Sequence, residues 1–390
     1  MKIAQNILNT FFPPIVGAKD LIKEIKPDKS IINLSQGIPS IMPPNQAVLM
    51  LTEKMSELES IHKYSDDRGI PELREEIKKD IYERHGIKIG VENILITAGA
   101  NMAFFQAILT LLNSGDTILI PSPYYFNYVM AANFLNVEVR EVNILNEDIF
   151  LEEFRNKLSD KLDAVLFINP ENPTGRVYDK EFLREVYKVS LKKNIVFIYD
   201  EVYRDFYIED GARHYSPIEE YGISENLIIL GSFSKSYGMT GYRVGYLIAD
   251  KEFIWNLLKV QDTNIICAPV ASQYLAYYSL KYFKNHPEEY VERLKKSVEI
   301  FCEKMKDVDW FNFRKPEGAI YTLLNYDFPI DGNEMVKMLY EREGILTVSG
   351  NSFGRFSNRS LRISFNDLDV ERILELKKRF EEFGKWIKEK

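Results

Sequence analysis

The chain is poor in the residues that build disulfide frameworks and metal sites. Its 390 residues include two cysteines, Cys267 and Cys302, and four histidines. The two cysteines show no paired spacing, which excludes a disulfide framework and makes a reducing compartment, the cytoplasm, the expected location. The histidines have neither an i, i+4 spacing nor a cysteine nearby, so the sequence predicts no metal site.

Two further absences concern membranes and nucleic acids. No run reaches the roughly 18 apolar residues that span a bilayer, and the first twenty residues contain no long apolar core followed by a small-residue cleavage site. Lysine and arginine number 50 against 58 aspartates and glutamates, and the net charge of −8 argues against a general attraction to nucleic acid or anionic lipid. We therefore expect a soluble protein without nucleic-acid or membrane partners.

Apolar residues make up 45% of the chain and aromatic residues 13%, enough for one large core or two cores of unequal size. In the middle of the chain, short apolar runs alternate with amphipathic stretches typical of helices, such as 101–113 and 179–194. The apolar runs are NILITAG (93–99), TILIPSP (117–123), AVLFINP (164–170), IVFIYDE (195–201), LIILGSF (227–233) and VGYLIAD (244–250). This alternation, with strands apolar on both faces, predicts an α/β fold in which helices flank a mostly parallel central sheet.

Two helices outside this region carry clear signals at their ends. Residues 68–86 form an amphipathic stretch with Pro71 suited to the first turn and Gly86 suited to the position just past the last turn. A closing helix is predicted from about Asp369 onward.

The last part of the chain indicates a second, smaller unit. After a mostly helical region come two further apolar runs, GAIYTLLNYD (318–327) and LRISF (361–365). We expect a large domain at 40–280 and a small α/β domain at 281–390, to which the N-terminal segment 1–39 contributes.

Four of the predicted strands are followed by groups that suit a ligand-binding site. Asn172 follows the third apolar run in a tight ENPTG turn, and Asp200 ends the fourth run three residues before Tyr203. Lys235 follows the fifth run, and Gly99 follows the first run at the start of a predicted helix. Because ligands of parallel α/β sheets bind beyond the carboxyl ends of the strands, we expect these groups to surround one pocket.

This set of groups suits pyridoxal phosphate. A lysine such as Lys235 binds the aldehyde of that cofactor as a Schiff base, and an aspartate such as Asp200 pairs with its protonated pyridine nitrogen. A tyrosine and an asparagine donate hydrogen bonds to its phenolic oxygen. The phosphate requires a helix N-terminus, hydroxyls and an arginine, which the stretch GSFSKSYGMTGYRVGY (231–246) supplies through its serines and Arg243.

At this point the sequence resembles the class I and II aminotransferases, the fold type I family of pyridoxal phosphate enzymes. The matching segments are LSQGIP, YSDDRGIPELREEI, ITAGANMAF, PSPYY, NPENPTG, YDEVY, SFSKSYGMTGYRVGY and LRISF. They follow the order and spacing of the family from about residue 33 to 365. The resemblance implies the fold type I architecture, a mostly parallel central sheet flanked by helices with a smaller α/β domain.

The resemblance also implies roles for residues on the cofactor side of the site. Lys235 is implied as the Schiff-base lysine and proton carrier, and Asp200 as the partner of the pyridine nitrogen. Tyr203 and Asn172 are implied as partners of the phenolic oxygen. The implied phosphate ligands are Ser232, Ser234, Arg243 and the backbone amides of Gly99, Ala100 and Asn101.

Further roles implied by the resemblance concern the substrate and a second subunit. Arg362 matches the arginine that binds the substrate α-carboxylate, helped by Asn172 and by the backbone at Gly37. Tyr125 matches the aromatic residue that stacks on the pyridine ring, although Tyr124 beside it is an alternative. Tyr64 matches a tyrosine that reaches the phosphate of the neighbouring subunit, which implies a homodimer with shared active sites.

The expected activity is transfer of the amino group of an L-amino acid to a 2-oxo acid by a ping-pong mechanism. Lyases, cyclases and oxidases of the same fold remain alternatives, because the residues around the lysine do not distinguish between these reactions. A cofactor-binding regulator without turnover is a third alternative, against which the intact Lys235 argues.

The substrate side chain is expected to be aromatic or bulky and neutral. Relatives that prefer dicarboxylates can carry a lysine where this chain has Asn101, and the expected pocket is apolar. The residues that indicate this pocket are Phe11, Phe12, Ile15, Tyr124 and Tyr125. The segment SGNSFG (349–354) also departs from the proline-glycine-serine sequence of many relatives, near the expected substrate entrance.

Overall fold

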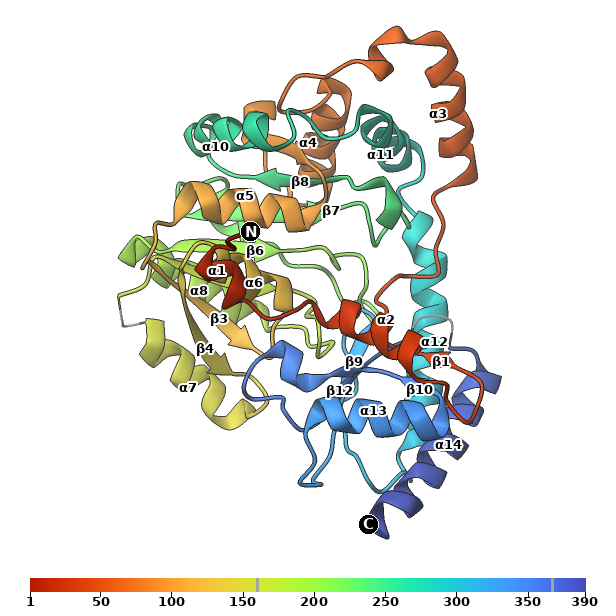
Figure 1. The fold of residues 1–390 in the computed structure, drawn as a ribbon. Helices are drawn as coiled ribbons and strands as arrows, with labels where there is room; N and C mark the ends of the chain where they lie inside the picture. The colour runs from red at the N-terminus through yellow and green to blue at the C-terminus, as the bar shows by residue number, and fades with distance from the viewer. Residues whose placement is uncertain (159–160, 366–367) are drawn as a thin grey trace.

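The computed structural model describes residues 1–158, 161–365 and 368–390. Its central element is a seven-stranded sheet with the strand order β2-β8-β7-β6-β5-β3-β4 (Figure 1). The strands are β2 (Ile94–Thr97), β8 (Gly245–Ile248), β7 (Leu227–Ser232), β6 (Val196–Asp200), β5 (Ala164–Ile168), β3 (Thr117–Ser122) and β4 (Glu138–Asn143). Neighbouring strands are parallel except at β8, which runs antiparallel to both of its neighbours. The predicted mostly parallel sheet is confirmed.

Helices cover both faces of this sheet, as the alternating burial of its strands requires. In β5, Val165 and Phe167 pack into one core and Leu166 and Ile168 into another, since successive side chains of a strand point to opposite faces. The first core also contains side chains of α4 (Pro71–His85), α7 (Glu147–Leu158), α8 (Lys180–Lys193) and α11 (Val270–Tyr282). The second contains side chains of α5 (Ala100–Leu111), α6 (Phe126–Phe134) and α10 (Lys251–Asn264).

Strand β4 was not among the predicted apolar runs. It pairs in parallel with β3 at the edge of the sheet, and most of its residues are only partly buried. Four of the six residues in its sequence EVREVN are charged or polar, which the edge of a sheet tolerates better than its centre does.

The predicted helix at 68–86 is confirmed as α4. Pro71 occupies its first turn, where a missing backbone N–H costs nothing. Gly86 follows its last residue with φ of 72°, a left-handed conformation that glycine adopts without strain. The closing helix is α14 (Val370–Lys388), and the Asp369 side chain accepts a hydrogen bond from the backbone N–H of Arg372 in its first turn.

A smaller group of elements lies beside the main sheet, in the lower right part of Figure 1. Its antiparallel sheet has the order β11-β12-β9. The strands are β9 (Tyr321–Asn325), β11 (Val348–Ser349) and β12 (Ser360–Ser364), and the helices are α12 (His286–Met305), α13 (Gly332–Glu343) and α14. From the N-terminal segment, β1 (Ile32–Asn33) pairs in parallel with β10 (Ile345–Leu346). These positions are compatible with the predicted division at 40–280 and 281–390, which stays a prediction.

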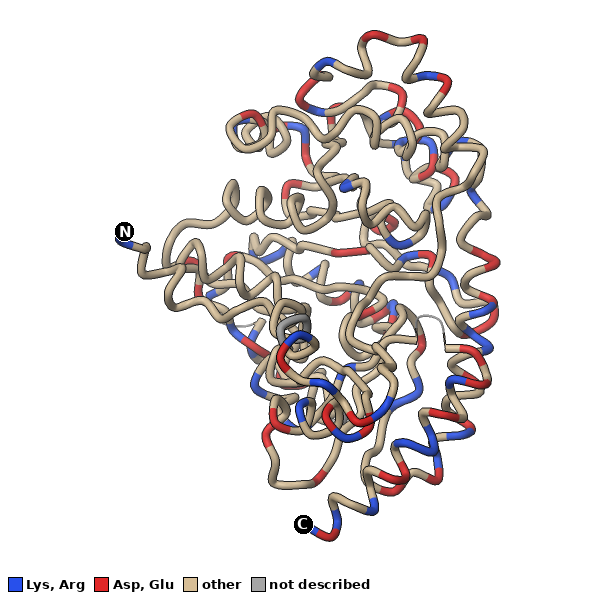
Figure 2. Tube along the Cα trace, turned by 45° about the vertical axis from the view of Figure 1, so that its right-hand side comes forward, with Lys and Arg blue, Asp and Glu red and all other residues tan. Residues whose placement is uncertain are grey.

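The remaining elements are short or lie outside the two sheets. They are α1 (Gln5–Leu8), α2 (Pro14–Glu24), α3 (Asn45–Glu57), α9 (Ile218–Tyr221) and the 3₁₀ turns η1 (Glu59–His62), η2 (Val91–Asn93), η3 (Thr240–Tyr242) and η4 (Gly350–Phe353). Charges of both signs are interspersed along the outer helices (Figure 2). No helix within the described residues is both long and apolar enough to cross a lipid bilayer.

Candidate active site

A cavity of about 240 Å³ lies where parallel strands β5, β6 and β7 end at their carboxyl side. This is the edge of an α/β sheet at which loops and helix N-termini converge on ligands. The predicted site residues that line it are Gly37, Ala100, Asn101, Tyr125, Asn172, Asp200, Tyr203, Ser232, Ser234, Lys235, Arg243 and Arg362. The structure therefore brings together most of the residues that the sequence singled out.

Lys235 is a partly buried amine that lines the cavity, with the guanidinium groups of Arg362 and Arg243 nearby. Its Nζ donates a hydrogen bond of 2.5 Å to the backbone carbonyl of Gly37. Burial lowers the pKa of Lys235, and the nearby positive charges of Arg362 and Arg243 lower it further, to about 8. A substantial fraction of this amine is thus neutral, and nucleophilic, in mildly alkaline solution.

Asp200 is a buried carboxylate at the end of β6 without a cationic partner in the described protein. It accepts hydrogen bonds from the Tyr128 hydroxyl at 2.5 Å and from the backbone N–H of Val202 at 2.9 Å. Burial raises the pKa of Asp200 to about 6, although both hydrogen bonds act in the opposite direction. The sequence reasoning missed Tyr128, whose only local signal is its place one helical turn after Tyr125 in α6.

An anion-binding corner forms where α5 begins. Gly99 precedes the helix with φ of 88°, and a Cβ added to it would lie 2.5 Å from Nη2 of Arg243. That guanidinium donates to the backbone carbonyls of Thr240 at 3.0 Å and Ala98 at 3.3 Å. On the adjoining loop, the Ser232 hydroxyl accepts a hydrogen bond from the backbone N–H of Ser234 at 3.1 Å. Helix dipole, amide groups, hydroxyls and guanidinium together suit a phosphate.

The opposite wall of the cavity is built around Arg362, which is 2% exposed. Its Nη1 donates to Oδ1 of Asn172 at 3.1 Å and its Nη2 donates to the carbonyl of Ser35 at 2.6 Å. Its Nε makes no hydrogen bond within the described residues. The guanidinium lies between two rings, 4.5 Å from the centroid of Tyr321 and 5.1 Å from that of Phe353. A buried guanidinium with unused N–H groups suits a carboxylate ligand.

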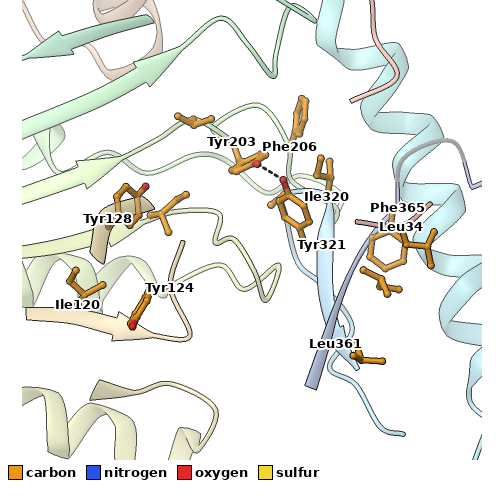
Figure 3. Close-up of a cluster of buried hydrophobic side chains, with 14 of the residues drawn as sticks. Leu34, Ile120, Tyr124, Tyr128, Tyr203, Phe206, Ile320, Tyr321, Leu361 and Phe365 are labelled. Carbon is orange, nitrogen blue, oxygen red and sulfur yellow. Dashed lines mark hydrogen bonds between the residues drawn. The ribbon is translucent and has the colours of Figure 1, made fainter. Parts of the chain in front are cut away.

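Tyr203 and Tyr321 both line the cavity and point their hydroxyls toward each other, as Figure 3 shows. Their hydroxyl oxygens are 2.9 Å apart and hydrogen-bonded, and their rings are nearly perpendicular. Tyr203 follows β6, whereas Tyr321 begins β9 of the smaller sheet. The sequence reasoning missed Tyr321 and Phe353 as site residues, because no local pattern distinguishes them from other core aromatics.

The structure places the two candidate stacking residues, Tyr125 and Tyr124, in different surroundings. Tyr125 lines the cavity, and its hydroxyl accepts hydrogen bonds from Asn127 at 2.9 Å and Asn101 at 3.5 Å. Tyr124 is buried elsewhere, beside Gly354. Tyr64 is 76% exposed and lies outside the cavity, so its implied contact with a second subunit stays a prediction.

The chain was compared with known proteins. Residues 29–380 match the family described as aminotransferase class I and II. The chain is 32% identical over 352 residues to a probable aspartate aminotransferase of Methanocaldococcus jannaschii, with 88% of this chain and 91% of that protein covered. It is 30% identical to an aromatic aminotransferase of Arabidopsis thaliana, with 93% of each covered. The crystal structure of an aspartate aminotransferase from Thermotoga maritima superposes with a TM-score of 0.87 at 30% identity, covering 98% of this chain and 99% of that one.

The groups around the cavity fit the cofactor of that family. Lys235 offers a partly neutral amine for the aldehyde, and Asp200 offers a buried carboxylate for a cationic ring nitrogen. The narrow cradle between Gly99 and Arg243 leaves no room for a Cβ but presents donors suited to a phosphate. Family match, architecture and donor set agree, and the chain belongs to the class I and II aminotransferases, enzymes that depend on pyridoxal phosphate.

Proposed function

We propose that the enzyme transfers the amino group of an aromatic or bulky neutral L-amino acid to a 2-oxo acid by a ping-pong mechanism. The observation that carries this proposal is the apolar wall of the cavity beside Arg362. Ile15 of α2, Ile38 and Phe126 line the cavity, and Ile15 and Phe126 pack with Phe353, whose ring lies against Arg362. Among the described residues, the cations that line the cavity are Lys235, Arg243 and Arg362. All three have roles in the proposed binding of the cofactor or of the α-carboxylate, which leaves none for an acidic substrate side chain.

When bound, pyridoxal phosphate supplies an electron sink that stabilises negative charge at the substrate α-carbon. With the cofactor in place, Lys235 Nζ would be the group that accepts the proton of the substrate α-carbon and releases it again, since its amine lines the cavity. The lowered pKa of Lys235, about 8, suits an amine that must both accept and release a proton.

The remaining residues of the site hold the cofactor and orient it. Asp200 pairs with the ring nitrogen, and Tyr203 and Asn172 donate to the phenolic oxygen. Tyr125 stacks on the ring. The phosphate is held by Ser232, Ser234, Arg243 and the backbone amides of Gly99, Ala100 and Asn101. Each of these residues except Gly99 lines the cavity, and Gly99 contacts Arg243.

Arg362 binds the substrate α-carboxylate through the N–H groups that Asn172 and Ser35 leave unused. Two aromatic rings fix the plane of its guanidinium, which favours a two-point contact with a planar carboxylate. The backbone at Gly37 completes this subsite.

The proposal includes a homodimer in which Tyr64 reaches the phosphate of the neighbouring subunit. Its support is the resemblance at Tyr64 together with the 76% exposure of that side chain. Sedimentation of the active, cofactor-loaded enzyme as a monomer would contradict it.

Aspartate is the competing donor, because two of the relatives compared above are named aspartate aminotransferases. The experiment loads the purified protein with pyridoxal phosphate and adds single L-amino acids without an acceptor. We expect one equivalent of 2-oxo acid per site, formed faster from phenylalanine, tyrosine or tryptophan than from aspartate or glutamate. Faster reaction of the acidic amino acids overturns the substrate class, and release of ammonia overturns transamination.

A further inference from the structure

Tyr321 lies where the two sides of the cavity touch. It begins β9, is 2% exposed and lines the cavity. Its hydroxyl is hydrogen-bonded to that of Tyr203 on the cofactor side, at 2.9 Å. Its ring lies under the guanidinium of Arg362 on the carboxylate side, with 4.5 Å from the guanidinium carbon to the ring centroid.

The same hydroxyl also limits what can stand at position 37. A Cβ added to Gly37 would lie 1.6 Å from Oη of Tyr321, so the backbone of Gly37 packs directly against the phenol. The carbonyl of Gly37 in turn accepts the hydrogen bond from Lys235 Nζ. Tyr321 thus contacts Tyr203 and Arg362 directly, and it packs against Gly37, whose carbonyl accepts the hydrogen bond from Lys235.

The direction of the hydrogen bond between the two phenols decides where the proton of Tyr203 points. Each hydroxyl has one proton, and either can donate in the pair. When Tyr321 donates to the oxygen of Tyr203, the proton of Tyr203 is free to point at an acceptor in the cavity. A hydroxyl that accepts a hydrogen bond is also a stronger donor, because bonds in a chain polarise one another.

We propose that Tyr321 is a positioning residue with two separable actions. Its hydroxyl orients and strengthens the hydrogen bond that Tyr203 donates to the cofactor's phenolic oxygen, and its ring holds the guanidinium of Arg362 for the substrate carboxylate. This inference rests on the proposed roles of Tyr203 and Arg362.

Two substitutions separate the actions. Tyr321→Phe keeps the ring and removes the hydroxyl, whereas Tyr321→Leu removes both. Tyr326→Phe is the matched control, because its hydroxyl also makes a single hydrogen bond, to the carbonyl of Ile330 at 3.1 Å, outside the cavity.

The first readout is the pH at which the absorption band of the bound cofactor titrates, measured without substrate. A weaker hydrogen bond to the phenolic oxygen leaves more negative charge beside the nitrogen that Lys235 contributes, so that this nitrogen holds its proton to higher pH. We expect Tyr321→Phe to raise the midpoint by about half a pH unit, in the same direction as Tyr203→Phe and by less. In the Tyr203→Phe background, Tyr321→Phe should cause no further shift, because the partner is gone.

The second readout is the dissociation constant of 3-phenylpropanoate, a carboxylate without an amino group, for the cofactor-loaded enzyme. We expect Tyr321→Leu to raise this constant about 10-fold, since an aromatic face under a buried guanidinium contributes up to about 2 kcal/mol, and Tyr321→Phe to leave it within about twofold.

The outcomes distinguish the inference from the proposed function. If the wild-type protein binds no pyridoxal phosphate or forms no 2-oxo acid, the proposed function fails. If the wild type does both, an unshifted midpoint in Tyr321→Phe, or equal shifts with and without Tyr203, overturns the action through the hydroxyl. Unchanged 3-phenylpropanoate binding in a folded Tyr321→Leu protein overturns the action through the ring.

Discussion

Two neighbouring carboxylates at the end of β6 have opposite environments. Asp200 points into the cavity, and burial raises its pKa to about 6. Glu201 is equally buried, yet its pKa is lowered to about 2. Since adjacent side chains leave an extended backbone on opposite sides, one residue step separates a ligand site from a structural ion-pair network.

The network around Glu201 compensates its charge. Its Oε2 is 3.1 Å from Nε2 of His214, and its Oε1 is 3.6 Å from Nη1 of Arg204. Burial by itself would raise the pKa of Glu201, but the hydrogen bond from His214 and the electrostatic interactions with His214 and Arg204 outweigh it. Arg204 in turn pairs with Asp80 at 2.7 Å, which joins the end of β6 to α4.

Asp200 has hydroxyl and amide donors but, among the residues that the structure describes, no such cation. A buried charge of this kind costs stability unless a ligand compensates it. Substitution should therefore distinguish the two carboxylates. Replacing Asp200 is expected to lower activity, whereas replacing Glu201 is expected to lower stability.

The largest effect is expected for Asp200→Asn. The asparagine oxygen can still accept from the backbone N–H of Val202 while its amide group donates to the Tyr128 hydroxyl, but the side chain cannot hold a cationic ring nitrogen. We expect kcat/KM to fall about 10²–10⁴-fold, whereas the free energy of unfolding of the cofactor-free protein at pH 8 stays equal or rises. Steady-state kinetics, corrected for bound cofactor, and urea unfolding measure the two. A large loss of stability with activity retained per folded molecule would contradict the assignment.

Glu201→Gln is expected to give the opposite result. It leaves Arg204 and His214 without their buried anion, and breaking a buried pair typically costs about 3–5 kcal/mol. Urea unfolding at pH 7 checks this loss, and kcat of the folded fraction should stay within a few-fold of wild type. Glu185→Gln is the matched control, because Glu185 forms an exposed pair with Arg155 at 2.7 Å that contributes at most about 1 kcal/mol.

Residue type and strand position were sufficient to predict which polar residues gather at the carboxyl ends of the strands. Lys235, Asp200 and Asn172 each follow a fully apolar run, and parallel strands bring their carboxyl ends together by geometry alone. The same reasoning predicts the sheet, except for β4, whose charged residues interrupt the apolar run because the strand lies at an edge.

The contacts of the carboxylate side could not be predicted in this way. Arg362 was identified by resemblance, but its partners Tyr321, Phe353 and Ser35 come from separate segments of the chain. Which of the adjacent tyrosines enters the cavity likewise depends on the turn before α6, where Tyr125 is the residue preceding the helix. Such contacts depend on tertiary packing, which a local pattern does not record.

The free energy of unfolding should depend on pH with opposite signs at the two carboxylates. Each pKa unit by which the folded and unfolded states differ changes this free energy by about 1.4 kcal/mol. The raised pKa of Asp200 means that the folded state binds its proton more tightly than the unfolded state does. Its contribution therefore becomes unfavourable as pH rises from about 4 to about 6, and is constant above. The lowered pKa of Glu201 gives stability that is present above about pH 4.5 and is lost as pH falls toward 2.

This pH dependence is tested by measuring the free energy of unfolding between pH 3 and 8. The proteins compared are the cofactor-free wild type, Asp200→Asn and Glu201→Gln. The advantage of Asp200→Asn over wild type should grow between pH 4 and 6. The deficit of Glu201→Gln should shrink below pH 4.5. Parallel curves for all three proteins would show that neither carboxylate titrates differently in the folded state.

The smallest effects are expected from the tyrosines that donate to each carboxylate. Tyr128 donates to Asp200 at 2.5 Å and Tyr246 donates to Glu201 at 3.4 Å. Tyr246→Phe removes a long bond from a carboxylate that keeps its cations, so we expect a loss of stability below about 1 kcal/mol and unchanged activity. Tyr128→Phe removes one of the two hydrogen bonds of Asp200, and raises the pKa of that carboxyl further.

Because a protonated Asp200 cannot pair with a cationic ring nitrogen, Tyr128→Phe should weaken cofactor binding most at low pH. We expect the dissociation constant of pyridoxal phosphate to rise about 10-fold at pH 6.5 and less at pH 8.5, since a hydrogen bond to a charged group contributes about 1.5–3 kcal/mol. Tyr246→Phe should bind the cofactor as the wild type does at both pH values. If both variants weaken binding equally at both pH values, the two sides of β6 are not electrostatically distinct, and the contrast between Asp200 and Glu201 has no functional meaning.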